Sequence, residues 1–175
     1  MYARFIGQLP HVRNRANLGA VQAFNVGGGR SVYGDSAMPS RQDLEWLLGR
    51  RIQAFVRREH DWVATFDGEV SLVIECMWRL IENGRIRFTS EDEGQWFGLR
   101  APVDAAAEVS SRITQTIVEG VELHDGTLDL EVCLSSGHTL QVMPVSSGYE
   151  AWNLSNGKKQ LIAVGGGELA IFSLN

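Results

Sequence analysis

The residues best suited to do chemistry lie in one short polar stretch, SEDEGQWFG at residues 90–98, where three consecutive acids precede two aromatic rings. Glu91, Asp92 and Glu93 could offer oxygens to a calcium ion, but the alternating ligand spacing of an EF-hand loop is missing. Acids beside a large ring such as Trp96 are also typical of a protein-binding surface, because a few aromatic anchors carry most of the energy of an interface. We therefore expect either a solvated loop or the edge of a protein interface.

A second acidic patch is formed by Glu119, Glu122 and Asp125. Carboxylates gathered in this way suit a basic partner, since complementary charges speed the encounter and disfavour wrong partners. Acidic surfaces also simply keep proteins soluble. Both interpretations stay open for this patch.

The other groups with catalytic or metal-binding potential are scattered along the chain. None of the four histidines lies four residues from another or beside a plausible pair of acids, and the two cysteines belong to no CxxC motif. We expect His60 and His124 to be exposed turn residues, and Cys76 and Cys133 to be buried free thiols. Motifs of serine hydrolases, zinc proteases and phosphate-binding loops are absent. The sequence thus predicts a protein that is not an enzyme, with no metal site and no cofactor.

The stretch SSGYEAWNL at residues 146–154 allows two interpretations. In one, Tyr149, Glu150 and Trp152 line a binding pocket. In the other, a turn enters a core strand, Trp152 is buried, and Glu150 accepts hydrogen bonds from the Ser-Ser-Gly turn because an uncompensated buried charge is costly. Trp78-Arg79-Leu80 and Trp152-Asn153-Leu154 are each followed by an Asn-Gly turn, which favours the core interpretation for both tryptophans.

The elements that must position these groups are mostly strands. Alternating apolar runs from residue 50 onward are separated by turn pairs such as Asp67-Gly68 and Asn83-Gly84, which predict antiparallel hairpins. We expect a four-stranded meander over 50–90, a helix over 102–117 and six further strands over 118–174. The fold class is therefore α+β and mostly antiparallel. Two related β units joined by one helix indicate a diverged duplication of 50–90 and 118–174, with chance similarity as the alternative.

The chain is expected to have two parts. We expect residues 1–48 to form an irregular extension with one short helix at about 40–48, which Ser40 can cap and Gly49 can end. We expect residues 49–175 to form the strand-rich domain.

Charge is distributed unevenly between these parts. Residues 1–58 contain nine arginines and three acids, a net charge of +6, whereas residues 59–175 contain 18 acids and seven basic residues, a net charge of −11. A nucleic-acid partner requires clustered basic surface, so we expect none. No apolar run is long enough to cross a bilayer and no secretory leader is evident, so we expect a cytoplasmic protein that binds no membrane.

Several short blocks along residues 49–173 resemble a family of small bacterial proteins of unknown biochemistry. The blocks are WRL at 78–80, a TS-x-D-x-G loop at 89–94, PVDA at 102–105, and SSGYE-x-W followed by GGGELA between 146 and 170. Such proteins resemble candidate immunity proteins of bacterial toxin systems, including contact-dependent growth inhibition.

The resemblance implies a protein that binds one cognate toxin, expected to be a basic nuclease-type domain, and occludes its active site. The residues expected at the toxin interface are Glu91, Asp92, Glu93, Trp96, Glu119, Glu122 and Asp125. The alternative is a small-molecule or cellular-protein binding module without catalytic activity.

Overall fold

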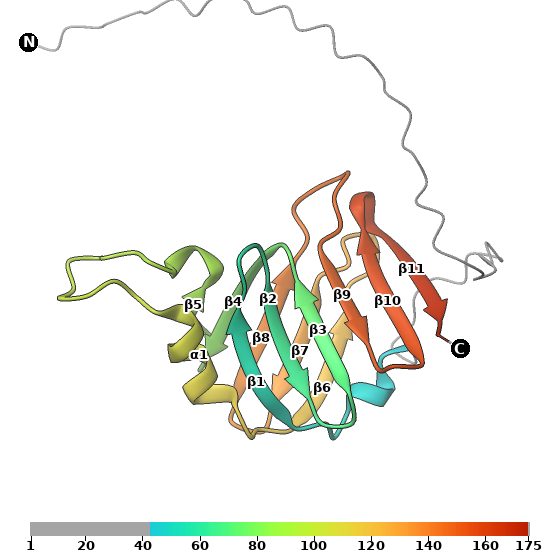
Figure 1. The fold of residues 1–175 in the computed structure, drawn as a ribbon, viewed down its shortest axis with the longest axis horizontal. Coiled ribbons are helices and arrows are strands. Elements are labelled where there is room, and N and C mark those ends of the chain that lie inside the picture. The colour runs from blue at the N-terminus through green and yellow to red at the C-terminus, as the bar shows by residue number, and fades with distance from the viewer. Residues whose placement is uncertain (1–42, 175) are drawn as a thin grey trace, which may run out of the picture. The chain divides into compact units, whose positions relative to one another are not determined.

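Two antiparallel β-sheets, stacked face to face, and one α-helix make up the described part of the chain, residues 43–174 of a computed structural model (Figure 1). The elements are η2 (Glu45–Leu47), β1 (Ile52–Arg57), β2 (Trp62–Phe66), β3 (Val70–Ile74), β4 (Met77–Glu82), β5 (Arg85–Thr89), η3 (Ser90–Asp92), α1 (Ala105–Ile113), β6 (Val118–Leu123), β7 (Leu130–Leu134), β8 (His138–Met143), β9 (Trp152–Ser155), β10 (Lys159–Val164), η4 (Gly165–Gly167) and β11 (Glu168–Ser173). One sheet has the order β1-β2-β3-β9-β10-β11 and the other β5-β4-β8-β7-β6. The predicted antiparallel, strand-rich fold with a linking helix is confirmed at this level.

The chain follows a similar path in its two halves. Strands β1, β2 and β3 form a meander in the six-stranded sheet, after which the chain crosses to the other sheet for β4 and β5. Strands β6, β7 and β8 form a meander in the five-stranded sheet, after which the chain crosses back for β9, β10 and β11. The crossing strands pair with the opposite half, β4 with β8 and β9 with β3. A duplicated β unit would produce this path, and the duplication itself stays a prediction.

The first crossing corrects the prediction of a four-stranded meander over 50–90. The run VSLVIECMWRLI was expected to be one strand, but it forms β3 and β4 in different sheets. Its inward alternation is nevertheless unbroken, because Cys76 packs against the core between two groups of buried side chains, Val70, Leu72, Ile74 and then Trp78, Leu80. A strand that bends at the corner of a β-sandwich keeps its apolar face inward, so the sequence pattern alone does not reveal the change of sheet.

Strand β1 departs from the alternation predicted for Ile52, Ala54 and Val56. The register against β2 shifts between Ile52 and Ala54, as in a β-bulge. One extra residue reverses the side-chain phase beyond it. Phe55 is therefore buried, whereas Val56 is 44% exposed.

Helix α1 is shorter than the predicted 102–117. The Asp104 carboxylate caps it by accepting a hydrogen bond from the N–H of Ala107 at 2.8 Å. At its other end Thr114 has an extended backbone, and the carbonyl of Thr116 accepts a hydrogen bond from the N–H of Ile52 at 2.9 Å. Pairing with β1 thus replaces the last predicted helical turn. No helix among residues 43–174 is long and apolar enough to span a bilayer.

The helix predicted at 40–48 is only partly within the described residues. There the chain forms the short 3-10 turn η2, which buries Leu44 and Leu47 and is followed by Gly49 at a φ of 76°. The cap residue Ser40 and most of the predicted extension, residues 1–42, lie outside the described range.

Two buried tryptophans occupy similar places in the two halves, which confirms their prediction as core anchors. Trp78 in β4 is 0% exposed and packs edge-on against Phe55 and Trp62, with ring centroids 5.2 and 4.8 Å away. Trp152 in β9 is 1% exposed, and its indole N–H donates a hydrogen bond to the carbonyl of Leu128 at 2.9 Å.

Candidate functional site

The loop between β5 and α1 projects from the two sheets, and we call its residues 94–103 the finger (Figure 1). Two backbone hydrogen bonds of 2.8 Å close its base, from Gly94 N–H to the Val103 carbonyl and from Val103 N–H to the Gln95 carbonyl. A tight turn forms its tip, where the Leu99 N–H donates to the Trp96 carbonyl. The central turn residues Phe97 and Gly98 have φ angles of 41° and 74°. The finger is thus a hydrogen-bonded hairpin rather than an irregular loop.

The tip of the finger is apolar and exposed. Trp96, Phe97 and Leu99 are 58%, 68% and 56% exposed. Contiguous apolar side chains on a protein surface mark sites of interaction, since leaving them in water is unfavourable. The sequence prediction identified Trp96 as an anchor but not the hairpin that presents it, because the backbone hydrogen bonds of the base join residues that are nine or eight positions apart.

The three acids that precede the finger do not form one interface patch. Asp92 completes a capping box at η3, whose N-cap is Thr89, by accepting a hydrogen bond from the Thr89 N–H at 2.8 Å. Glu93 accepts one from the Ala105 N–H at the start of α1, 2.7 Å away, and lies 3.5 Å from the Arg57 guanidinium. Among the three, only Glu91 is exposed, whereas Asp92 and Glu93 are half-buried. Asp92 and Glu93 therefore hold the base of the finger against the fold.

The second predicted patch lies elsewhere. Glu119 and Glu122 are exposed on β6, and Asp125 is exposed in the turn that follows. Strand β6 is at the opposite edge of the five-stranded sheet from β5, which precedes the finger. Four strand spacings of about 4.8 Å separate the two edges by roughly 19 Å. The structure does not bring the two predicted patches together.

The residues of SSGYEAWNL do not line a common pocket. Tyr149 is 80% exposed, whereas Trp152 is in the core. The prediction that Glu150 pins the turn from the buried face of a strand is wrong. Glu150 precedes β9, which begins at Trp152, and its side chain is exposed. The Ser146 hydroxyl holds the turn instead, accepting hydrogen bonds from the N–H groups of Gly148 at 3.2 Å and Tyr149 at 3.1 Å.

The glycines of the β10–β11 connection are required by close backbone packing. A Cβ atom on Gly165 would lie 2.4 Å from the Gly148 nitrogen, and one on Gly167 would lie 1.9 Å from the Gly126 carbonyl oxygen. Three loops thus meet where only glycine fits. They surround a hollow of about 350 Å³ lined by Gly126, Thr127, Pro144, Val145, Ser146, Ser147, Gly166 and Gly167.

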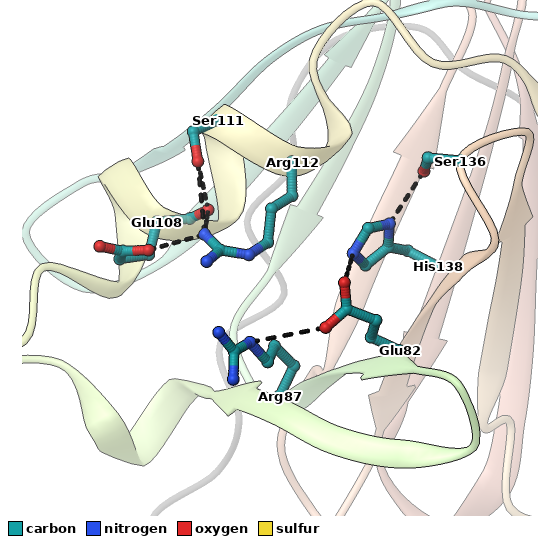
Figure 2. Close-up of polar contacts among 7 residues, drawn as sticks. All are labelled: Glu82, Arg87, Glu108, Ser111, Arg112, Ser136 and His138. Carbon is teal, nitrogen blue, oxygen red and sulfur yellow. Dashed lines mark hydrogen bonds and ion pairs between the residues drawn. The ribbon is translucent and has the colours of Figure 1, made fainter.

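Sequence reasoning missed a polar cluster around the buried His138 (Figure 2). The Ser136 hydroxyl lies 3.0 Å from Nδ1 of His138, and a carboxylate oxygen of Glu82 lies 3.3 Å from Nε2. The Glu82 contact has the distance of an ion pair but lacks the alignment of a hydrogen bond. Figure 2 shows Arg87 on the other oxygen of the Glu82 carboxylate, 3.6 Å away.

A hydroxyl and a carboxylate on one imidazole resemble the arrangement that activates a serine nucleophile. Here, however, Ser136 lies in the turn just before β8, only two residues from His138 at the start of that strand, and Glu82 is shared with an arginine. The hollow described above is lined by other residues. The contacts tie β8, β4 and β5 together beside α1, where Arg112 lies over the Phe88 ring at 4.9 Å.

A second cluster missed from the sequence lies on the outer face of the five-stranded sheet. Glu122, His124 and Glu131 each offer a ligand atom, and these atoms are all within 4.8 Å of one another. Glu131 and Glu122 are directly opposite in the β6–β7 register. The signal in the sequence is the spacing of Glu122 and His124, since side chains two residues apart share one face of a strand. His124 is exposed, as predicted.

The two cysteines differ in environment, and the prediction that both are buried is wrong for Cys133 and holds only in part for Cys76, which is half-buried against the core. Cys133 is exposed on β7. Burial raises the pKa of the Cys76 thiol to about 12, because the charged thiolate is disfavoured away from water. The Cys76 thiol is therefore protonated near neutral pH.

Comparison with known proteins identifies one family. A family of unknown function (DUF6188) matches residues 43–173, which are three quarters of the chain and nearly all of its described part. No curated protein and no solved structure matches the chain.

Proposed function

The chain belongs to this family of unknown function, and we propose that it is a binding protein that neutralises a cognate bacterial toxin by covering its active site, with the finger as its anchor. The observation that carries the proposal is the exposed apolar tip of a hydrogen-bonded hairpin. The toxin as partner rests on the resemblance of the sequence blocks to candidate immunity proteins.

The preformed hairpin structure of the finger favours protein binding. A preformed hairpin loses little conformational entropy when a partner covers it, which leaves more of the contact energy for affinity. An aromatic side chain can bury about 150–250 Å². Because Trp96 and Phe97 are already partly covered and remain 58% and 68% exposed, a partner would bury roughly 200–300 Å² more on the two rings together. A standard interface buries about 800 Å² on each partner. The finger is therefore an anchor within a larger interface that extends onto neighbouring surface.

Charge favours a basic partner. The described residues 43–174 contain 20 acids and 11 basic residues, a net charge of −9. Nuclease-type toxins must bind phosphates with basic groups. An acidic protein would be attracted to that same surface and would compete with the nucleic acid for it. A cytoplasmic location belongs to the proposal, since a nuclease toxin meets its substrate there.

The test is co-expression with the product of the gene immediately upstream, read out as growth rescue and as a complex that survives purification. A double variant, Trp96→Ala with Phe97→Ala, should lose both. Its free energy of unfolding should stay within about 0.5 kcal/mol of the parent, because substitutions of exposed residues cost little. Tyr149→Ala is the matched control, because it removes an even more exposed ring from a different loop.

Three outcomes would contradict the proposal in different ways. Full rescue by the finger variant would show that the finger is not the anchor. Equal loss in the Tyr149→Ala control would indicate a nonspecific effect of removing surface rings. If the neighbouring genes encode no toxin, the toxin part fails while protein binding by the finger can still be tested.

A small-molecule binding module is the second candidate. The hollow between the three loops, lined by Ser146 and Ser147, is the observation that favours it. A ligand that binds only the folded protein raises its melting temperature. A thermal-shift screen should then find a metabolite that raises the melting temperature. This effect should be lost in Ser147→Trp, because the larger side chain fills the hollow. If the chain only binds a toxin, no such compound would be found.

A further inference from the structure

We propose that Glu122, His124 and Glu131 form a binding site for a divalent transition-metal ion, with Zn²⁺ as the best match. The site lies on the outer face of the five-stranded sheet, at the edge where β6 pairs with β7. It lies apart from the finger, at the opposite edge of the sheet from β5, and shares Glu122 with the second predicted acidic patch.

The positions of the three side chains follow from strand geometry. Glu122 lies in β6 and His124 follows two positions later, so both project from one face. Glu131 in β7 is the direct register partner of Glu122. The Nε2 atom of His124 is 3.6 Å from a carboxylate oxygen of Glu131, and all three ligand atoms lie within 4.8 Å of one another.

The separation of the His124 and Glu131 ligand atoms is close to that of a zinc site. Ligand atoms at about 2.1 Å from a tetrahedral Zn²⁺ are roughly 3.4 Å apart. The His124–Glu131 pair, at 3.6 Å, is within about 0.2 Å of that edge. A small rotation of the exposed Glu122 side chain would complete the triangle. The imidazole argues against Ca²⁺ and Mg²⁺, which prefer oxygen ligands alone.

The like charges give a reason for a cation at this place. Two carboxylates directly opposite on neighbouring strands destabilise the pairing. His124 can compensate only one of them, and only when it is protonated. A bound divalent ion neutralises both carboxylates and uses the neutral imidazole as a ligand.

A relay of side chains from the neighbouring strands orients Glu131. The Gln141 amide on β8 donates a hydrogen bond of 2.7 Å to a Glu131 carboxylate oxygen. The Arg79 guanidinium on β4 in turn donates to the side-chain amide oxygen of Gln141. Register places these residues in one row across the sheet, Arg79 opposite Gln141 and Gln141 opposite Glu131. Such outer contacts fix a metal-binding carboxylate in place before the ion arrives.

The site is open to solvent. The His124 side chain is 45% exposed and that of Glu131 is 29% exposed. Three protein ligands leave the fourth position of a tetrahedral ion for water or for a group of another molecule. The structure thus points to an accessible ion rather than one enclosed within the core.

The experiment is a titration of the full chain, first freed of metal with a chelator, with ZnCl₂ by calorimetry and with Co²⁺ by visible absorption. We expect one ion per chain and a tetrahedral Co²⁺ spectrum without the intense band of thiolate ligation. His124→Ala should abolish this binding. Gln141→Leu should weaken it by about 10- to 100-fold, the usual effect of losing an outer-shell hydrogen bond to a ligand.

Glu119→Gln is the matched control, because it removes one negative charge from β6 outside the cluster. Its affinity should stay within about twofold of the parent, since separated surface charges are screened by salt. Equal weakening by Glu119→Gln and Glu131→Gln would mean diffuse attraction and would overturn the site. A thiolate band in the Co²⁺ spectrum, or unchanged binding by His124→Ala, would also overturn it. Unchanged melting temperatures of the metal-free variants would show that they remain folded.

Discussion

Trp78 and Trp152 allow one substitution to be compared at two similar positions. Both rings are buried in the core at the crossing strands of their respective halves. They differ in their indole N–H groups, because that of Trp152 donates to the Leu128 carbonyl, whereas that of Trp78 has no hydrogen-bond partner among the described residues. Phenylalanine removes the N–H group and shrinks the ring in the same way at each position.

The expected difference follows from this hydrogen bond. Trp152→Phe leaves the buried carbonyl of Leu128 without its donor, and an unsatisfied buried polar group costs about 1–3 kcal/mol. Trp78→Phe removes a buried N–H that is already unsatisfied, so part of the cost of its smaller ring is offset. We therefore expect Trp152→Phe to be less stable than Trp78→Phe by about 1–3 kcal/mol. Truncation of Trp152 to alanine should cost about 3–5 kcal/mol, as is usual for a large buried ring.

Urea unfolding of the full chain measures this difference. With a slope of about 2 kcal/mol per molar urea, the midpoints of the two phenylalanine variants should differ by about 0.5–1.5 M. The slopes must agree for the midpoints to report stability alone. Equal midpoints, or a lower midpoint for Trp78→Phe, would refute the reasoning, since ring volume rather than the hydrogen bond would then govern the cost.

Two further predictions concern thiol reactivity and the turn before β9. At pH 8 a thiol of pKa about 12 has roughly a thousandth of the thiolate of an ordinary cysteine, so iodoacetamide should label Cys133 and leave Cys76 unmodified. The Cys76 thiolate forms only as pH rises towards 12. Rapid labelling of both cysteines in the native protein at pH 8 would contradict the burial of Cys76. In the turn, Ser146→Ala should cost about 1 kcal/mol and Glu150→Gln less than about 0.5 kcal/mol, whereas the reverse order in chemical denaturation would restore Glu150 as the residue that pins the turn.

Local chemistry made much of the fold predictable. The Asn83-Gly84 pair forms a two-residue turn between β4 and β5, with φ angles of 52° and 72° that these residue types tolerate best. Asp104 caps α1 because a carboxylate can accept from the first N–H groups of a helix wherever that helix packs. The six strands after α1 were all anticipated, with bounds that shift by a few residues. Trp78 and Trp152 were recognised as core residues because their environments repeat along the chain.

What the sequence by itself determined is thus the set of elements, their turns and the large core side chains, since each depends on residues close together in the chain. Only the tertiary structure decided which strands share a sheet, because backbone pairing between β3 and β9 or β4 and β8 depends on packing over long separations. It also decided that Asp92 and Glu93 support the finger while Glu122, His124 and Glu131 meet. Cross-strand register places side chains from separate segments within a few ångströms of each other, and that register comes from burial of the whole core rather than from any local pattern.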